Sequence, residues 1–176
     1  MKKHIVCFGD SNTHGYCADP NDCADGGNRF NEDERWTCLL QKALGDEYLV
    51  LEEGLGGRTT VFADPLHEAM DGLSAAFPVL MTHEPVSLLI LMLGTNDTKE
   101  RFAANAPAIA VGMERLIQKC KTVDCWAARP RTSLWSARRG SARASMTRSW
   151  ARAAWKNPSL CRRIWRLSRS ATMSTI

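Results

Sequence analysis

The last third of this 176-residue chain contains no acidic residue. All 19 Asp and Glu residues lie within residues 1–124, which carry 11 Lys and Arg residues and a net charge of −8. Residues 125–176 carry 12 Lys and Arg residues, a net charge of +12 and five of the six tryptophans. This change in composition divides the chain at Asp124. We therefore predict a globular domain over residues 1–124 and a basic Arg/Ser/Trp-rich region over residues 125–176.

Long apolar runs, an export signal and paired cysteines are also missing. No apolar run approaches the ~20 residues that cross a bilayer. The apolar stretch after the N-terminal lysines covers only residues 5–8, which is too short for a signal peptide. The seven cysteines form no Cys-x-x-Cys pair, so neither a disulfide framework nor a zinc site is predicted. These absences favour a cytoplasmic protein with reduced thiols and no bound metal.

Three apolar runs in the first region are predicted to be strands. They cover residues 3–8, part of residues 47–55, and residues 86–93, and small or polar residues follow each of them. The third is apolar throughout, as expected for a central parallel strand covered on both faces. Helical spacing over residues 35–45 and 107–121 gives a β-α-β pattern, then connecting turns, then a β-α unit. This alternation predicts an α/β fold with a doubly wound parallel sheet.

A short polar motif follows each predicted strand. The motifs are Asp10-Ser11-Asn12, Gly56-Gly57-Arg58 and Thr95-Asn96-Asp97. Because the carboxyl ends of parallel strands meet at one edge of a sheet, the motifs should converge. There, Ser11 could act as a nucleophile, while the N–H groups of Ser11 and Gly57 and the Asn96 amide could donate to a developing oxyanion. Each motif alone could be only a helix cap or a turn, but the three together favour the chemical interpretation.

Three stretches carry a resemblance to a known family: FGDSNTHGY from residue 8, EEGLGGRTT from residue 52 and LMLGTNDTK from residue 91. They resemble the first three sequence blocks of the SGNH, or GDSL, hydrolases, most closely small bacterial arylesterases that also act as acyltransferases and perhydrolases. The likeness runs over about residues 3–121 and includes Glu34-Arg35-Trp36. It implies a flavodoxin-like, three-layer α/β/α fold and hydrolysis of small esters through a serine acyl-enzyme. It also implies homo-oligomers and no cofactor.

The resemblance also implies roles for individual residues. Ser11 is the expected nucleophile, and the expected oxyanion hole consists of the Ser11 N–H, Gly57 and Asn96. Two carboxylates are expected to support the loops: Asp10 and Asp97. Three further residues are candidates for the wall of the pocket: Asn12, His14 and Arg58. None of these roles involves a metal.

The base that would activate Ser11 is missing from the chain. A serine hydroxyl is a weak nucleophile until a histidine, oriented by a carboxylate, takes its proton. The family supplies both groups as Asp-x-x-His near its C-terminus, and this chain has no such motif. Its only histidines are His4, His14, His67 and His83. His14 is expected to be a pocket-wall residue, His4 to be structural, and the other two to be solvated, so weak or absent turnover is predicted.

The basic region has two interpretations. One is a nucleic-acid-binding arm, since arginines neutralise phosphates and tryptophans stack on bases. The other is translation of GC-rich DNA in the wrong frame. When the third base of each codon is joined to the first two of the next, Trp150-Ala151 must give Gly, Trp155-Lys156 must give Glu and Met146-Thr147 must give Asp. Loss of one base between about Trp126 and Pro130 would explain both the composition and the missing Asp-x-x-His.

Three functions are therefore compared. The sequence favours a serine ester hydrolase of the arylesterase or short-chain carboxylesterase type, with acyl transfer as a related reaction. The first alternative is an inactive domain of the same fold that binds acyl or carbohydrate ligands. The second is an α/β domain with a nucleic-acid-binding tail, and steep weakening of binding with salt would identify it.

Overall fold

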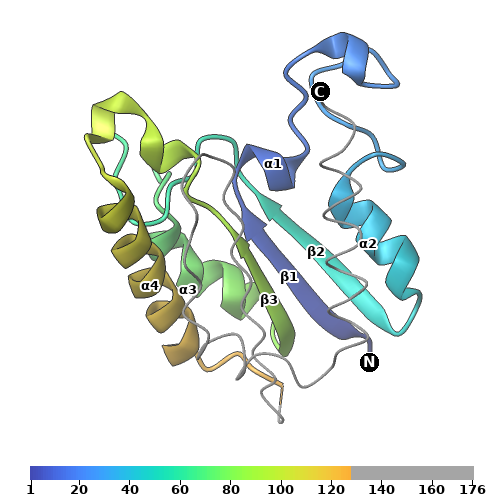
Figure 1. Cartoon of the computed structure of the whole chain (residues 1–176). Helices are drawn as coiled ribbons and strands as arrows, with labels where there is room; N and C mark the ends of the chain where they lie inside the picture. Colours follow the sequence, from blue (N-terminus) through green and yellow to red (C-terminus); the bar gives the residue numbers. More distant parts are fainter. Residues whose placement is uncertain (128–176) are drawn as a thin grey trace.

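A parallel sheet with helices on both sides is the main feature of residues 1–127, the part of the chain that the computed structural model describes (Figure 1). The strands are β1 (Lys3–Gly9), β2 (Tyr48–Gly54) and β3 (Val86–Met92). The α-helices are α1 (Ser11–His14), α2 (Trp36–Leu44), α3 (Gly72–Thr82) and α4 (Ala106–Thr122). Three short 3₁₀ helices cover Pro20–Asp22, Asn96–Thr98 and Glu100–Phe102. The nucleic-acid arm and the out-of-frame interpretation concern residues outside the described part.

The strand order is β2-β1-β3, and both strand pairs are parallel. β1 is the central strand, and its residues from Ile5 onward are buried because both faces of the sheet are covered. Parallel strands need a crossover between them, and a helix lies in each crossover here. The predicted α/β class with a parallel sheet is confirmed.

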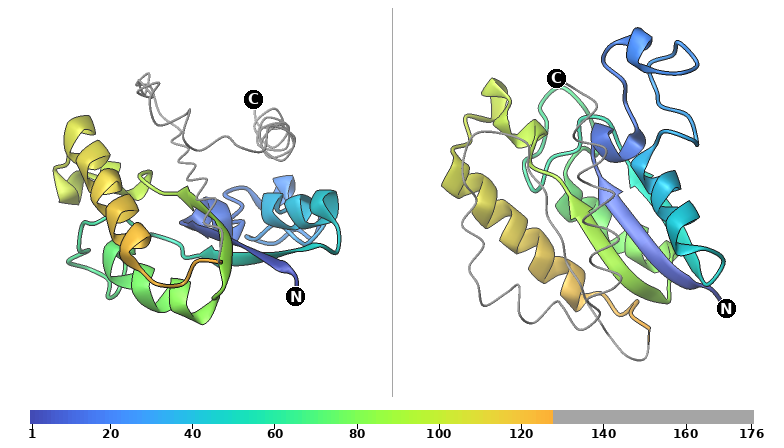
Figure 2. Two further views of the ribbon diagram at one scale, coloured as in Figure 1. Left: turned by 90° about the horizontal axis from the view of Figure 1, so that it is seen from below. Right: turned by 45° about the vertical axis from the view of Figure 1, so that its right-hand side comes forward.

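Successive residues of β1 face two different clusters of apolar side chains. Val6 and Phe8 belong to the larger cluster, which contains side chains from α3 and α4. Ile5 and Cys7 belong to the smaller one, which Leu40 of α2 completes. This alternation follows from the two-residue period of a strand. The result is a three-layer α/β/α arrangement, and Figure 2 shows α2 and α3 on opposite sides of the sheet.

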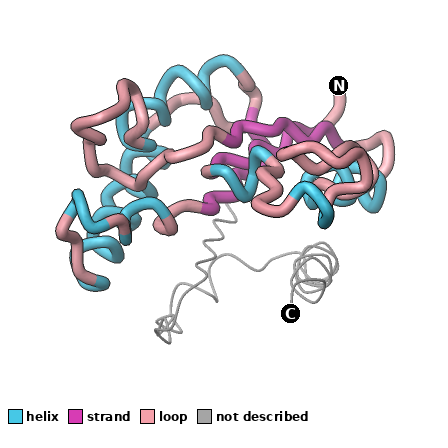
Figure 3. Tube along the Cα trace, turned by 90° about the horizontal axis from the view of Figure 1, so that it is seen from above, coloured by secondary structure: helices cyan, strands magenta, loops and turns pink. Residues whose placement is uncertain are grey.

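The three strands end level with one another. Gly9, the last residue of β1, lies opposite Gly54 of β2 and Met92 of β3. The segments that follow the strands therefore start from the same edge, which faces the viewer in Figure 3. This register brings the three polar motifs to one side of the domain, as the sequence pattern predicts.

The two helices predicted from apolar spacing are confirmed with small differences at their ends. α2 stops at Leu44, where Gly45 donates its N–H to the carbonyl of Gln41. α4 begins after Asn105, whose side chain accepts from the N–H of Ala108 at 2.9 Å and so caps the helix. Local signals decide both helix ends, which is why the sequence alone identifies them.

The prediction of connecting turns between β2 and β3 is wrong, because α3 occupies residues 72–82. An interior proline normally breaks a helix, and Pro78 lies in the middle of this one. The helix persists because Asp71 caps it, accepting from the N–H of Ser74 at 2.8 Å, and because Ala76 and Leu80 are buried in the core. Tertiary packing outweighs the local cost of Pro78.

Residues beyond Asp124 continue to pack on the sheet up to the end of the described part. The N–H of Val86 donates to the carbonyl of Cys125 at 2.7 Å, and the N–H of Ala127 donates to that of Val86 at 3.0 Å. Trp126 thus pairs in parallel with Val86 at the outer edge of β3. Cys125 is buried in the larger core cluster. The division at Asp124 remains a prediction from composition.

A search of the described helices for a membrane span gave none of sufficient length and apolar character.

Candidate active site

Ser11 is the first residue of a one-turn helix that follows directly on β1. Asp10 caps this helix, since its Oδ1 accepts from the backbone N–H and from the side-chain amide of Asn12, both at 2.9 Å. The cap is therefore Asp10, and the alternative that Ser11 or Asn12 is only a cap is wrong. Ser11 is half-buried, and its hydroxyl makes no side-chain hydrogen bond among those found in residues 1–127. Burial raises the pKa of Asp10, while the hydrogen bonds from Asn12 oppose that shift.

Two glycines let the helix of Ser11 lie directly on the strand ends. A Cβ added to Gly54 would be 2.1 Å from the backbone nitrogen of His14 and 2.5 Å from the carbonyl carbon of Thr13. A Cβ added to Gly9 would be 2.0 Å from Oγ1 of Thr13. Distances of this size are far below van der Waals contact. The position of Ser11 therefore depends on the absence of a side chain at the ends of both β1 and β2.

The second motif forms a tight turn after β2. Leu55 donates its N–H to the carbonyl of Gly9, and Arg58 donates its N–H to the carbonyl of Leu55, both at 3.1 Å. Gly57 has φ +89°, a left-handed conformation that favours glycine. The turn is thus hydrogen-bonded to Gly9, the last residue of the strand that precedes Ser11.

The third motif meets the second through Asn96. The buried Asn96 amide donates to the carbonyl of Arg58 at 3.0 Å. A side-chain amide nitrogen carries two N–H groups, so this contact leaves a second donor for another acceptor. The polar residues after β1, β2 and β3 are therefore linked as the sequence analysis expects.

Asp97 joins the loops after β2 and β3 in the interior. It is 0 % exposed, and both of its oxygens accept from the N–H of Thr60, at 3.0 and 3.1 Å. The Thr60 hydroxyl donates to it as well. Asp97 therefore connects its own loop to the loop that carries Thr60.

Replacing Asp97 with alanine is expected to lower the free energy of unfolding by about 2–3 kcal/mol, because two buried donors of Thr60 would lose their acceptor. Urea denaturation would measure the change, with Glu114→Ala at an exposed position of α4 as the control. A loss for Asp97→Ala no larger than that of the control would contradict this view of Asp97.

The expectation that Arg58 lines the pocket is wrong. Arg58 is 6 % exposed, and its guanidinium donates to the carbonyls of Gly9 and Glu53 while lying 4.4 Å from the ring centroid of Phe8. Burial lowers the pKa of Arg58, and the charges of Glu53 and Asp10 oppose that shift. The side chain turns inward because backbone carbonyls at the ends of β1 and β2 need donors. It clamps these strand ends together and does not face a substrate.

The hydrogen bonds of three histidine side chains are made with groups other than Ser11. His83 was expected to be solvated, but its side chain is only 17 % exposed and its Nε2 lies 2.6 Å from the Glu53 carboxylate. His4 contacts the carbonyl of His83 through Nδ1 at 2.9 Å. His67 lies beside Asp64 at 3.4 Å. Within residues 1–127, no histidine is hydrogen-bonded to Ser11.

A surface hollow of about 450 Å³ is lined by residues 63–71. Met70 connects it to the site, because its Sδ is 3.6 Å from where a Gly57 Cβ would lie. Its carbonyl accepts from the N–H of Thr59 at 2.9 Å. The described residues contain no cluster of side chains that could hold a metal ion.

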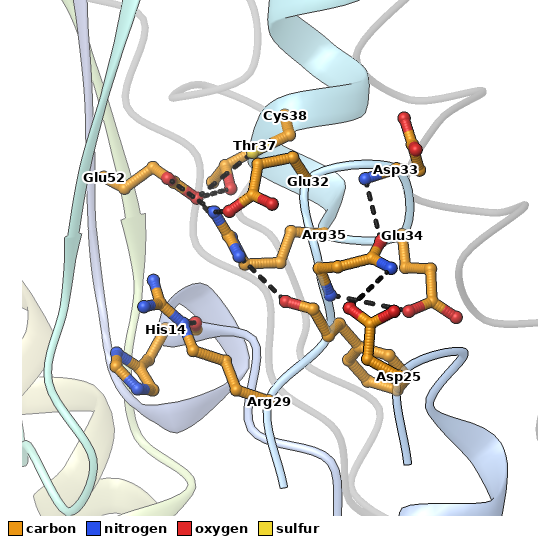
Figure 4. Close-up of polar contacts among 12 residues, drawn as sticks. His14, Asp25, Arg29, Glu32, Asp33, Glu34, Arg35, Thr37, Cys38 and Glu52 are labelled. Atoms are coloured by element: carbon orange, nitrogen blue, oxygen red, sulfur yellow. Dashed lines mark hydrogen bonds and ion pairs between the residues drawn. The ribbon is translucent and has the colours of Figure 1, made fainter. Parts of the chain in front are cut away.

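A buried polar network beside the site was not found by sequence reasoning (Figure 4). At its centre, Arg35 is 6 % exposed and contacts Glu52 of β2 at 3.1 Å and Glu32 at 2.9 Å. Thr37 also donates to Glu52. The only sequence signal was the Glu34-Arg35-Trp36 stretch.

Comparisons with known proteins give consistent matches. The GDSL-like lipase/acylhydrolase family matches residues 7–159. The native aryl esterase of M. smegmatis is 40% identical, with a TM-score of 0.65, over 75% of this chain and 62% of its own. A carbohydrate acetylesterase family member from Sinorhizobium meliloti is 37% identical, with a TM-score of 0.66, over 76% of this chain and 62% of its own. The inhibitor-bound M. smegmatis enzyme gives 32% identity and a TM-score of 0.68 over 97% of this chain and 78% of its own.

The chain thus spans 62% of the length of the first two of these structures, which is less than two thirds. A comparison with curated proteins found no match.

Proposed function

The chain belongs to the GDSL-like lipase/acylhydrolase family, and from this membership we propose that it is an ester hydrolase with Ser11 as the nucleophile. One observation carries the proposal. Ser11 begins a helix capped by its neighbour Asp10, its hydroxyl has no structural partner among residues 1–127, and Gly57 and Asn96 lie on linked loops at the same edge. A serine whose hydroxyl is not engaged in a hydrogen bond within the protein, and which lies near hydrogen-bond donors, is suited to act as a nucleophile in acyl transfer.

In the proposed reaction, the oxygen of Ser11 attacks the ester carbonyl carbon. The N–H of Ser11 lies at the start of a helix, where backbone donors have no intrahelical partner. Together with the Gly57 N–H and the second N–H of the Asn96 amide, it would stabilise the tetrahedral oxyanion. Collapse of this intermediate would release the alcohol and leave an acyl-serine, which water would hydrolyse. Loss of one such donor typically slows turnover about 100–1,000-fold.

We propose small acyl or aryl esters as the substrate class. The solved structures that match are named for an aryl esterase and a carbohydrate acetylesterase, which supports small acyl groups. We propose that the hollow lined by residues 63–71 receives one part of such a substrate. Acyl transfer to an alcohol other than water would follow the same steps. We also propose, from the resemblance to the family, that the chain forms homo-oligomers.

A reducing compartment such as the cytoplasm is proposed as the location. The six cysteines among the described residues are all free, and five of them are buried. Free buried thiols are typical of proteins that are kept reduced.

Labelling with a fluorophosphonate tests the role of Ser11. We expect slow labelling of the 176-residue chain under excess reagent, because the oxyanion donors remain although the base is missing. Peptide mass spectrometry should place the label on Ser11, and Ser11→Ala should abolish it. Ser74→Ala is the matched control, since Ser74 also lies near a helix start but donates its hydroxyl to Asp71.

Failure of the folded chain to react would favour the first alternative, an inactive ligand-binding domain. The absence of an Asp-x-x-His motif from the chain supports this alternative, because an inactive domain needs no catalytic base.

A further inference from the structure

We infer that the segment of residues 16–36, which runs from the end of α1 to the first residue of α2, positions the helix of Ser11, and that Trp36 and Arg29 are its positioning residues. The inference rests on the proposed function of Ser11. Neither residue is expected to touch the substrate. Both act through the backbone of α1.

The helix of Ser11 is too short to be stable by itself. It has four residues, and the first turn of a helix is unfavourable to form because it fixes several residues for one hydrogen bond. The last four carbonyls of any helix have no intrahelical partner. In α1 the Ser11 carbonyl accepts from the N–H groups of Gly15 at 3.0 Å and Tyr16 at 2.9 Å. The carbonyls after Ser11 need donors from elsewhere.

Two side chains of the segment supply such donors. The indole N–H of Trp36 donates to the carbonyl of Asn12 at 3.2 Å. Nε of Arg29 donates to the carbonyl of His14 at 2.8 Å. A cation at the C-terminal end of a helix also interacts favourably with the helix dipole. Trp36 and Arg29 thus hold the end of α1 opposite the proposed oxyanion site.

The segment that brings these donors is fixed by Arg35. Its guanidinium bonds to Glu52, Glu32 and the carbonyl of Phe30, as Figure 4 shows in part. Burial alone would lower the pKa of Arg35, but the hydrogen bonds to Glu52 and Glu32 raise it. A Cβ added to Gly15 would lie 2.5 Å from Cδ of Arg35. Gly15, which ends α1, therefore packs against Arg35, and Arg35 is hydrogen-bonded to Glu52 of β2.

The segment also folds back on itself. Phe30 donates its N–H to the carbonyl of Gly15 at 2.8 Å, and Cys17 donates to that of Asn28 at 2.9 Å. The carboxylate of Glu34 accepts from the N–H of Ala24 at 3.1 Å. These contacts restrict the segment, so the positions of Trp36 and Arg29 are defined relative to β2 as well as to α1.

The test uses the full chain and two substitutions that each remove one donor. Trp36→Phe keeps an aromatic ring but loses the indole N–H, and Arg29→Met keeps a similar aliphatic stem but loses the guanidinium. Amide exchange followed by NMR would report the opening of α1 at Gly15 and Tyr16. We expect both amides to exchange about 3- to 10-fold faster, because the loss of one hydrogen bond makes local opening of α1 more favourable by a corresponding factor. Labelling of Ser11 by a fluorophosphonate should slow by a similar factor.

Three controls separate positioning from general loss of structure. Arg29→Lys restores a cationic donor and should recover most of the protection at Gly15 and Tyr16. Arg115→Met removes an exposed arginine of α4 and should change neither amide. The amide of Val6, within the central strand, should keep its exchange rate in every variant, since global unfolding would alter it as well.

The two readouts make the failures distinguishable. Unchanged exchange at Gly15 and Tyr16 in both Trp36→Phe and Arg29→Met would overturn the inference. Faster exchange that Arg29→Lys does not reverse would overturn it for Arg29. If exchange changes as expected but no variant, nor the parent chain, is labelled at Ser11, then the proposed function fails while the structural role of the segment stands.

Discussion

Hydrolysis of p-nitrophenyl acetate is expected to rise by about four to six orders of magnitude when one base is restored to the gene between the codons for Trp126 and Pro130. We propose that the change of frame would replace the acid-free region with one that contains acids and the family's Asp-x-x-His. The 176-residue chain retains the proposed nucleophile and the proposed oxyanion donors but has no histidine after His83. The 176-residue chain itself should therefore turn over weakly or not at all.

The physical reason is the weakness of a serine hydroxyl as a nucleophile. Without a base, its proton must pass to water as the bond to the substrate forms, and oxyanion stabilisation alone supplies only part of the rate. A histidine oriented by a carboxylate removes that proton at neutral pH.

The first measurement is a DNA read from the codon for Lys119 to about two hundred bases past the stop, translated in all frames. The expected result is an open frame that reaches an Asp-x-x-His. Restored protein and its Ser11→Ala variant would then be assayed beside the 176-residue chain. Stops in the alternative frame would show that the basic region is genuine, and the search for a base would return to His14. Equal rates for the 176-residue chain and the restored protein would also refute the proposal.

Substitution of Gly54 with alanine is expected to reduce the rate of Ser11 labelling, and kcat/KM of the restored protein, about 100-fold. A Cβ at this position would lie 2.1 Å from the backbone of His14, and backbone atoms cannot move aside as a flexible side chain can. Helix α1 would have to shift, and displacement of a reacting group by about 1 Å can cost a factor of this size. The melting temperature should also fall, because the crowded core cannot absorb the methyl group.

Gly56→Ala is the matched control for this prediction. Gly56 lies two residues further along the chain, in the loop after β2, and a Cβ there would have no heavy atom of a non-neighbouring residue within 4 Å. Its labelling rate and melting temperature should match the parent. If Gly54→Ala behaves like Gly56→Ala, the close contact between α1 and β2 does not determine the position of Ser11.

Several elements could be predicted because their signals are local. The apolar run of β3 and the helical spacing of α2 and α4 repeat at the period of the structure they form. The convergence of the motifs around Ser11, Gly57 and Asn96 followed from a single further rule, that parallel strands end at one edge. The family resemblance came from the same three motifs. The function that we propose thus depends on residues close to strand ends.

Errors arose where distant contacts outweigh local preference. Connecting turns were predicted where α3 lies, but burial of Ala76 and Leu80 stabilises a helix there in spite of Pro78. His83 was expected to be solvated because it falls in a polar connecting segment, yet Glu53, thirty residues earlier in the chain, lies within hydrogen-bond distance. Neither effect leaves a trace in the sequence near the residue concerned.

The sequence by itself determined the strands, two of the helices, the three motifs and the absence of an Asp-x-x-His, because period, residue type and spacing suffice for each. Only the tertiary structure decided where long side chains point. Arg58 turns inward to bond the ends of β1 and β2, and Arg35 fixes the segment beside α1 through Glu52, seventeen residues away. A flexible charged side chain takes the direction in which its donors find acceptors, and those acceptors exist only after the strands have paired.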